Sequence, residues 1–245
     1  MRRITLLTDF GTADGYVAAM KGVLCTRGAG VILEDAGHGL PRGDVAHAAW
    51  TLRRFWDRFP AGTVHLVVVD PGVGTDRAAL AVEAGGILLV GPDNGVFTPV
   101  YDSGKPWRAV SLPIPEDASS SFHGRDVVAP AAAELAAGAA LESLGPLVED
   151  PVRLSFEPLP PGTGRVRTVD RFGNLITDLD GSALEGASRV EIGGRTVRVA
   201  AAYGSVAPGA LLALVGSDGT VEVAARDSSA MSLLGAGVGT RVRVL

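Results

Sequence analysis

The stretch Thr63-Val64-His65-Leu66-Val67-Val68-Val69 decides the fold class of this chain. It is almost continuously apolar and rich in β-branched valine, a composition typical of a strand that is buried on both faces of a parallel sheet. Asp70-Pro71-Gly72 ends the apolar run at once. We therefore predict a central strand in a sheet that helices cover on both sides.

The segments around this strand alternate between strand and helix patterns. Such alternation predicts an α/β domain with a largely parallel sheet. Asp44 precedes one predicted helix as its N-cap, and Pro130 is tolerated in another because it falls in the first turn. The predicted strands are 4–8, 31–33, 63–69, 79–82 and 87–90, and the predicted helices are 14–26, 45–55 and 127–137.

The pattern changes after Glu149. Residues 151–164 contain four prolines and are predicted to form a linker between a domain at 1–150 and a second domain at 165–245. In the second domain, apolar and charged residues alternate along 190–192 and 197–199, on the two sides of Gly193-Gly194. This pattern is typical of a β-hairpin. Further short strands are predicted at 211–215, 221–224 and 241–245. The second domain is therefore expected to be a small antiparallel sheet or barrel.

Composition limits the function. The 245 residues carry a net charge of −5, so no basic excess is available for nucleic acid, and no apolar run reaches the roughly 18–20 residues that span a bilayer. Met1-Arg2-Arg3 leads directly into a strand without the apolar segment of a signal peptide, which favours a cytoplasmic protein. The single cysteine, Cys25, lies among apolar residues at helical spacing and is expected to pack in the core rather than act as a nucleophile.

Three acidic segments follow predicted strands: Thr8-Asp9-Phe10-Gly11, Asp70 to Arg77, and Pro92-Asp93-Asn94-Gly95. A single aspartate there commonly caps a turn, but three at one sheet edge favour a polar ligand with hydroxyl groups such as a ribose. Gly72-Val73-Gly74 lacks the G-x-G-x-x-G spacing and a Walker lysine, and flanking acids would repel phosphate, so we expect no dinucleotide cofactor.

Other polar segments are ambiguous on pattern alone. Phe122-His123-Gly124-Arg125-Asp126 precedes a helix and fits either a turn or a site equally well. Asp170 to Asn174 and Ser217-Asp218-Gly219 read by themselves as polar turns. The four histidines do not have zinc-site spacing, so no metal site is predicted.

Taken together and in this order, these segments resemble the S-adenosyl-L-methionine (SAM) hydrolase family. Its members are also called SAM hydroxide adenosyltransferases and are related to the fluorinase and the chlorinase. The resemblance implies a Rossmann-like N-terminal domain and a C-terminal β-barrel. It also implies a homotrimer that binds SAM between subunits and splits it into adenosine and L-methionine without a metal or cofactor.

The resemblance also implies roles for individual residues. Asp70, Arg77 and His123 match the catalytic set, and Asp9 matches the carboxylate that holds the ribose hydroxyls. The other positions implied to face the substrate are Phe10, Gly124, Asp170, Asn174, Tyr203, Ser217, Glu222 and Ala230. The C-terminal match is looser, because residues 226–230 depart from the family's usual Asn-Ala-Ala run.

Hydrolysis and halogenation differ at two of these positions. The fluorinase resemblance places a Tyr where this chain has Asp70, and a Tyr-Ser pair where it has His123-Gly124. A buried carboxylate would repel a halide, so Asp70 and His123 favour water as the nucleophile. Two alternatives stay open: a SAM-dependent halogenase, and a SAM- or adenosine-binding protein without turnover.

Overall fold

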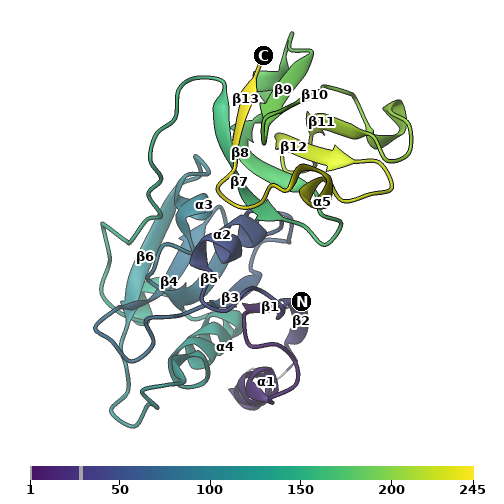
Figure 1. The fold of residues 1–245 in the computed structure, drawn as a ribbon. Coiled ribbons are helices and arrows are strands. Elements are labelled where there is room, and N and C mark those ends of the chain that lie inside the picture. The colour runs from purple at the N-terminus through teal and green to yellow at the C-terminus, as the bar shows by residue number, and fades with distance from the viewer. Residues whose placement is uncertain (1, 28–29) are drawn as a thin grey trace. The chain divides into compact units, whose positions relative to one another are not determined.

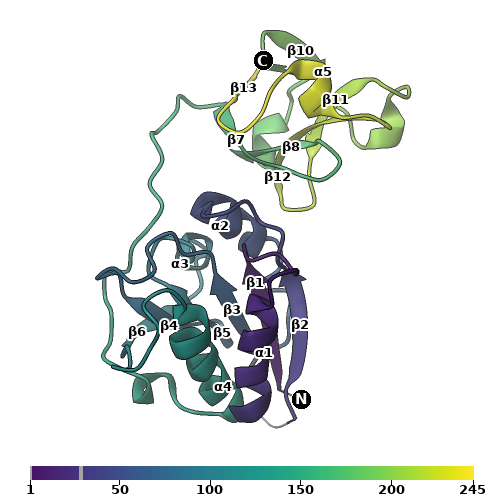
Figure 2. The same cartoon turned by 60° about the horizontal axis from the view of Figure 1, so that its bottom comes forward.

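The computed structural model describes residues 2–27 and 30–245 and divides the chain into two compact units, up to Ser155 and from Phe156 onward (Figure 1; Figure 2). Met1, on which the expected lack of a signal peptide partly rests, lies outside these residues. The first unit extends to Ser155 because two backbone N–H groups are held by earlier side chains. Val152 donates to Asp93 Oδ1 at 2.8 Å and Leu154 donates to Thr98 Oγ1 at 2.8 Å.

The first unit contains a six-stranded sheet in the order β2-β1-β3-β5-β4-β6. The α/β expectation is confirmed, but the sheet is mixed: β2, β1, β3 and β5 pair in parallel, whereas β4 is antiparallel to both β5 and β6. The Rossmann-like label is not confirmed. β4 and β5 are joined only by Gly85-Gly86, which is too short for a parallel crossover. The strands are β1 Arg3–Thr8, β2 Ile32–Gly37, β3 Val64–Val68, β4 Ala79–Ala84, β5 Ile87–Pro92 and β6 Trp107–Leu112.

Helices cover both faces of this sheet (Figure 2). Leu66 and Val68 of β3 lie in one apolar cluster with α1 (Tyr16–Arg27) and α4 (Ala129–Ala137). Val67 and Val69 lie in the other cluster, with α2 (Val45–Arg53) and α3 (Thr98–Tyr101). This alternation explains why the β3 sequence is apolar at nearly every position. No helix in the described ranges combines the length and apolarity needed for a membrane span.

Two helical predictions need correction. Cys25 was expected in the core but is exposed. The inward face of α1 is formed by Val17, Met20 and Leu24, and the next residue is turned about 100° away. The helix predicted over residues 127–137 becomes α-helical only at Ala129. It follows a π-helical turn, η1 (Gly124–Val128), after which the N–H of Ala129 bonds to the carbonyl of Gly124. Pro130 then falls in the first turn of α4, as expected.

His65 of β3 is fully buried, and both of its ring nitrogens are bonded. Nε2 lies 2.8 Å from the carbonyl of Trp56, and Nδ1 lies 2.7 Å from the hydroxyl of Thr5. Burial lowers the pKa of His65 to about 4. The folded protein therefore binds no proton at His65 in the range where the unfolded chain, with an ordinary histidine pKa of about 6.5, does so.

Stability is accordingly expected to fall as the pH is lowered from 6.5 to 4. Protonation of the unfolded state at His65 alone contributes up to about 3 kcal/mol to this fall. Urea unfolding at several pH values should show a smaller decrease for His65→Gln than for the original protein. Equal decreases in the two proteins would contradict the assignment.

The second unit is a seven-stranded antiparallel sheet in the order β10-β9-β13-β7-β8-β12-β11. Its two end strands, β10 and β11, approach each other: a bridge joins Val199 to Ala213, and the N–H of Ala200 bonds to the carbonyl of Ala213 at 2.9 Å. The sheet is thus a nearly closed barrel, with α5 (Ala230–Leu234) following β12. The strands are β7 Thr163–Val169, β8 Leu175–Asp180, β9 Arg189–Ile192, β10 Arg195–Arg198, β11 Leu211–Val215, β12 Thr220–Ala225 and β13 Arg241–Val244, with 3-10 turns at Gly181–Leu184 and Tyr203–Ser205. A further 3-10 turn, Leu141–Ser143, belongs to the first unit.

Candidate functional site

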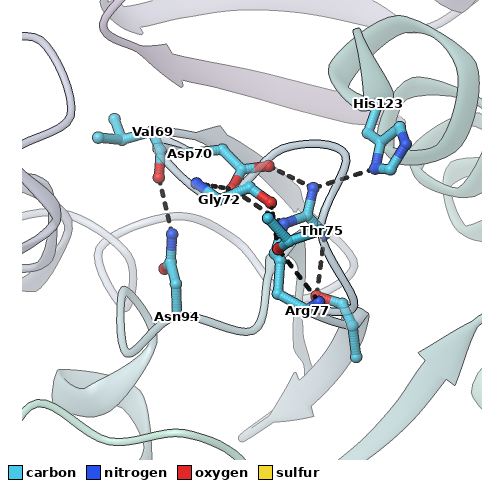
Figure 3. A network of polar contacts seen from close by, with 8 residues as sticks. Val69, Asp70, Gly72, Thr75, Arg77, Asn94 and His123 are labelled. Atoms are coloured by element: carbon cyan, nitrogen blue, oxygen red, sulfur yellow. Dashed lines mark hydrogen bonds and ion pairs between the residues drawn. The ribbon is translucent and has the colours of Figure 1, made fainter. Parts of the chain in front are cut away.

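Asp70, Arg77 and His123 form a continuous polar network in the first unit (Figure 3). The guanidinium of Arg77 binds the carboxylate of Asp70 through two of its nitrogens. Nε donates to Oδ1 at 2.9 Å, and Nη2 pairs with Oδ2. The same Nη2 lies 3.2 Å from Nδ1 of His123. Only 5% of the Asp70 side chain and 10% of the Arg77 side chain are exposed, and His123 is buried as well. The three residues predicted to be catalytic are thus brought together.

The contact with Arg77 sets the tautomer of His123. A guanidinium can only donate hydrogen bonds, so His123 Nδ1 must accept. Neutral His123 then carries its hydrogen on Nε2, and that N–H is the donor it can offer to a ligand. This tautomer is assigned from the Arg77 N–H group that faces Nδ1.

The loop between β3 and β4 is shaped to place Arg77. The N–H of Gly72 donates to Asp70 Oδ1 at 3.2 Å, and the Thr75 hydroxyl donates to the carbonyl of Gly72 at 2.7 Å. Gly74 has a φ of 79°, and a Cβ there would lie 2.4 Å from the carbonyl oxygen of Ser120. Only glycine fits both the conformation and the space, so this loop packs closely against the loop that leads to His123.

Asn94 is a positioning residue that the sequence analysis did not assign to the site. Its Nδ2 donates to the carbonyl of Val69 at 2.9 Å (Figure 3). Its Oδ1 accepts from the N–H of Val96 at 3.2 Å. Because β5 lies beside β3, the turn after β5 reaches the end of β3. Asn94 therefore holds the peptide that immediately precedes Asp70.

Asn94→Ala is expected to lower kcat by roughly tenfold while leaving KM within about twofold, because a small displacement of Asp70 disturbs the network without removing substrate contacts. The loss of one hydrogen bond should reduce the free energy of unfolding by only about 1 kcal/mol. Steady-state kinetics and urea unfolding provide the two readouts. Asn94→Asp is a second test, because it keeps the acceptor for Val96 but loses the donor to Val69. Unchanged kcat in both variants would remove Asn94 from the site.

Asp9 and Phe10 lie just after β1, in the same unit. Asp9 Oδ2 accepts from the N–H of Gly43 at 2.7 Å. The ring of Phe10 packs 5.9 Å from that of Phe122, and both rings contact Tyr16, which is half exposed. These residues therefore form an aromatic cluster that includes the neighbour of His123.

Gly124 directly follows His123 and is closely packed. A Cβ at this position would lie 3.3 Å from both Met20 Sδ and Val68 Cγ1. A side chain at Gly124 would therefore press against α1 and β3. The glycine allows the π-helical turn that follows His123 to sit directly on the sheet.

Four of the six predicted site residues of the second unit form two bonded pairs. Asp170 accepts from the backbone N–H of Asn174 at 2.9 Å and from its side-chain Nδ2 at 3.0 Å, which makes a tight turn between β7 and β8. The hydroxyl of Tyr203 donates to Glu222 Oε1 at 2.5 Å. Burial and the Glu222 carboxylate raise the pKa of Tyr203, and Asp170 adds to this shift through its charge.

Ser217 and Ala230 lie apart from these pairs. Ser217 is exposed in the hairpin between β11 and β12 and bonds only to its neighbour Asp218 among the contacts described. The Ala230 side chain is fully buried in the barrel core. The exposed fraction of the whole residue is zero, so its backbone is buried as well.

Within residues 2–27 and 30–245, no group of three or more histidine, cysteine, aspartate or glutamate side chains is placed to hold a metal ion. The chemistry available at the site is that of a fixed guanidinium, a carboxylate and an imidazole N–H donor. Such a set can orient and polarise a small nucleophile.

Comparisons with known proteins show which family the chain is similar to. The chain is 44% identical to an (R)-S-adenosyl-L-methionine hydrolase of Thermus thermophilus, with all of both chains covered. A fluorinase of an Actinoplanes species is more distant, at 27% identity over 75% of this chain and 74% of the fluorinase. A crystal structure of an uncharacterized conserved protein from Thermotoga maritima superposes with a TM-score of 0.91 at 32% identity, covering 99% of this chain and 100% of that one.

Family models give the assignment directly. The N-terminal domain of SAM hydroxide adenosyltransferases matches residues 4–145, and the C-terminal domain matches residues 164–243. These two segments fall within the two compact units of the structure. The chain therefore belongs to the SAM hydroxide adenosyltransferase family.

Proposed function

We propose that this protein hydrolyses SAM to adenosine and L-methionine by attack of water on the ribose C5′. The observation that carries the proposal is the buried network in which Arg77 joins Asp70 to His123. The names of the relatives, which include (R)-S-adenosyl-L-methionine hydrolases at 42–44% identity, support the same reaction and suggest preference for the (R) sulfonium epimer.

The reaction suits this set of residues. Methionine leaves C5′ as a neutral thioether from a sulfonium cation, so the leaving group needs neither protonation nor a metal. Water supplies the oxygen, the C5′–S bond breaks as the C5′–O bond forms, and one proton passes to the solvent for each SAM consumed. The site must therefore mainly hold the oxygen in line with the C5′–S bond.

The network suggests how the oxygen is held. His123 Nε2–H donates to the oxygen and leaves a lone pair for C5′, while the Arg77 charge stabilises hydroxide character as the proton departs. Arg77 engages both Asp70 oxygens and only 5% of the Asp70 side chain is exposed, so we assign Asp70 the role of fixing the guanidinium rather than that of binding ribose. Ribose binding is assigned to Asp9, in agreement with the resemblance.

The residues of the second unit are proposed to contact the rest of SAM. Asp170 with Asn174, and Tyr203 with Glu222, provide acceptors suited to the ammonium group and to polar edges of adenine. The family resemblance further suggests a homotrimer with substrate bound between subunits, and the composition of the chain favours a cytoplasmic location. Light scattering coupled to gel filtration tests the trimer.

Prolonged incubation with the separate (R) and (S) epimers of SAM in ¹⁸O-labelled water, followed by chromatography and mass spectrometry, tests the reaction. We expect adenosine with ¹⁸O at the 5′ position and faster turnover of the (R) epimer. A parallel incubation with fluoride or chloride tests the alternative reaction. Formation of a 5′-halo-5′-deoxyadenosine would overturn the proposal, and tight SAM binding without any product would instead indicate a binding protein.

A further inference from the structure

The barrel of the second unit has an open seam lined by arginines. β10 and β11 are the two end strands of its sheet and are bridged only at Val199 and Ala213 in the described residues. A cavity of about 440 Å³ lies beside this bridge, lined by β10 and by the segment that leads into β11. Its volume lies within the range of small-molecule sites, roughly 300–1,000 Å³.

Three arginines line this cavity: Arg189, Arg195 and Arg198, here called the seam arginines. The strand register places Arg189 and Arg198 on one face of the sheet and Arg195 on the other. Arg189 and Arg198 stand directly opposite each other on β9 and β10. Like charges in directly opposed positions destabilise a sheet unless something compensates them. The pairing therefore carries an electrostatic cost.

The ion pairs seen among the described residues of the second unit are made by other arginines, namely Arg165, Arg167, Arg226 and Arg243. Glu191, on the same face of β9, is paired with Arg243. Leu245 donates its N–H to the carbonyl of Arg189, but no ion pair joins its carboxylate to that side chain. This cluster exists in a chain whose net charge is −5.

Further donors face the same space. β10 is an edge strand, so alternate N–H groups along it point away from β9, toward the open seam. Thr196 adds a hydroxyl, while Leu211 and Leu233 provide apolar wall. Arg195 also bonds to the carbonyl of Leu233 at 3.2 Å, which fixes its position at one end of the cavity.

We propose that this seam binds a phosphate-type oxyanion. Arginine forks, backbone N–H groups and a hydroxyl are the groups that bind phosphoryl oxygens. None of the residues proposed to contact SAM lines the cavity, so the seam is a separate site.

The test is calorimetric titration of the full-length protein with inorganic pyrophosphate. We expect saturable binding that weakens roughly tenfold or more in Arg189→Gln and in Arg198→Gln, because each change removes charge-assisted hydrogen bonds. Arg58→Gln is the matched control, since Arg58 is exposed in the first unit and loses the same charge. Thermal melts should show that all three variants remain folded.

A titration with ADP identifies the source of the phosphoryl groups. ADP binding that weakens in the seam variants would indicate a nucleotide-borne phosphate, whereas binding of pyrophosphate alone would indicate the free anion. Adenosine release from SAM should be unchanged in these variants, so failure of this proposal is distinguishable from failure of the proposed hydrolysis. Absence of pyrophosphate binding, or binding that is unaffected by Arg189→Gln and Arg198→Gln, would overturn the site.

Discussion

Replacing Arg77 by alanine is expected to lower kcat for adenosine release by about 10³-fold or more. The guanidinium is the only group that joins the Asp70 carboxylate to the His123 ring in the network described. Removing a single preorganised donor from an active site commonly costs about 10²–10³ in kcat, and the loss of His123 orientation adds to this. Single-turnover measurement of adenosine formation at saturating SAM provides the readout.

Arg77→Ala is also expected to lower the free energy of unfolding. Without Arg77, Asp70 is left as a charge with only 5% of its side chain exposed, and breaking such a pair costs roughly 3–5 kcal/mol. The double variant Asp70→Asn, Arg77→Gln removes both charges and is expected to recover most of the stability but none of the activity. Activity that returns together with stability would show that the guanidinium has no chemical role.

Arg77→Lys separates charge from geometry. Lysine keeps the positive charge but cannot hydrogen-bond to both oxygens of Asp70 while also donating to His123. We therefore expect turnover above that of Arg77→Ala but still far below that of the original protein. Full activity in Arg77→Lys would mean that charge alone suffices.

His123→Ala is expected to lower kcat by roughly 10²–10³-fold with little change in SAM affinity. His123 accepts from Arg77 at Nδ1, so its contribution to the reaction is the Nε2–H donor. Removing one donor to the reacting oxygen has an effect of this size. Calorimetric SAM binding and single-turnover kinetics separate the two readouts.

His123→Gln distinguishes a donor from a base. The glutamine amide can supply an N–H near the position of Nε2 but cannot take up a proton. If His123 acts as a donor, His123→Gln should be at least about tenfold more active than His123→Ala. If the two variants are equally inactive while both bind SAM, His123 acts by accepting the proton of water.

Much of the fold could be predicted from the sequence because burial leaves a direct pattern. β3 is apolar on both faces, and both faces pack on helices. The direction of β4 was not predicted, although Gly85-Gly86 between two apolar runs is a hairpin signal. Cys25 was misplaced because α1 is weakly amphipathic, and only the positions of Val17, Met20 and Leu24 reveal which face is buried.

Less of the candidate site than of the fold could be predicted from the sequence. His123 lies 46 residues after Arg77, and its segment alone fits a turn as well as a site. Only the ordered resemblance grouped the two residues before their contact was seen. Asn94 could not be assigned because its partner is a backbone carbonyl, and a carbonyl has no signature in the sequence. That contact depends on β5 lying next to β3, which is a property of the whole sheet.

The π-helical turn after His123 has a consequence for how this protein can change over evolutionary time. A π turn contains one more residue than an α turn. Deletion of one residue from Gly124–Val128 would therefore convert this turn into a regular α-helix that begins at His123. Each residue of an α-helix advances the side-chain direction by about 100°. A deletion there would swing the imidazole away from Arg77. Related sequences should therefore rarely gain or lose a residue along Gly124–Val128.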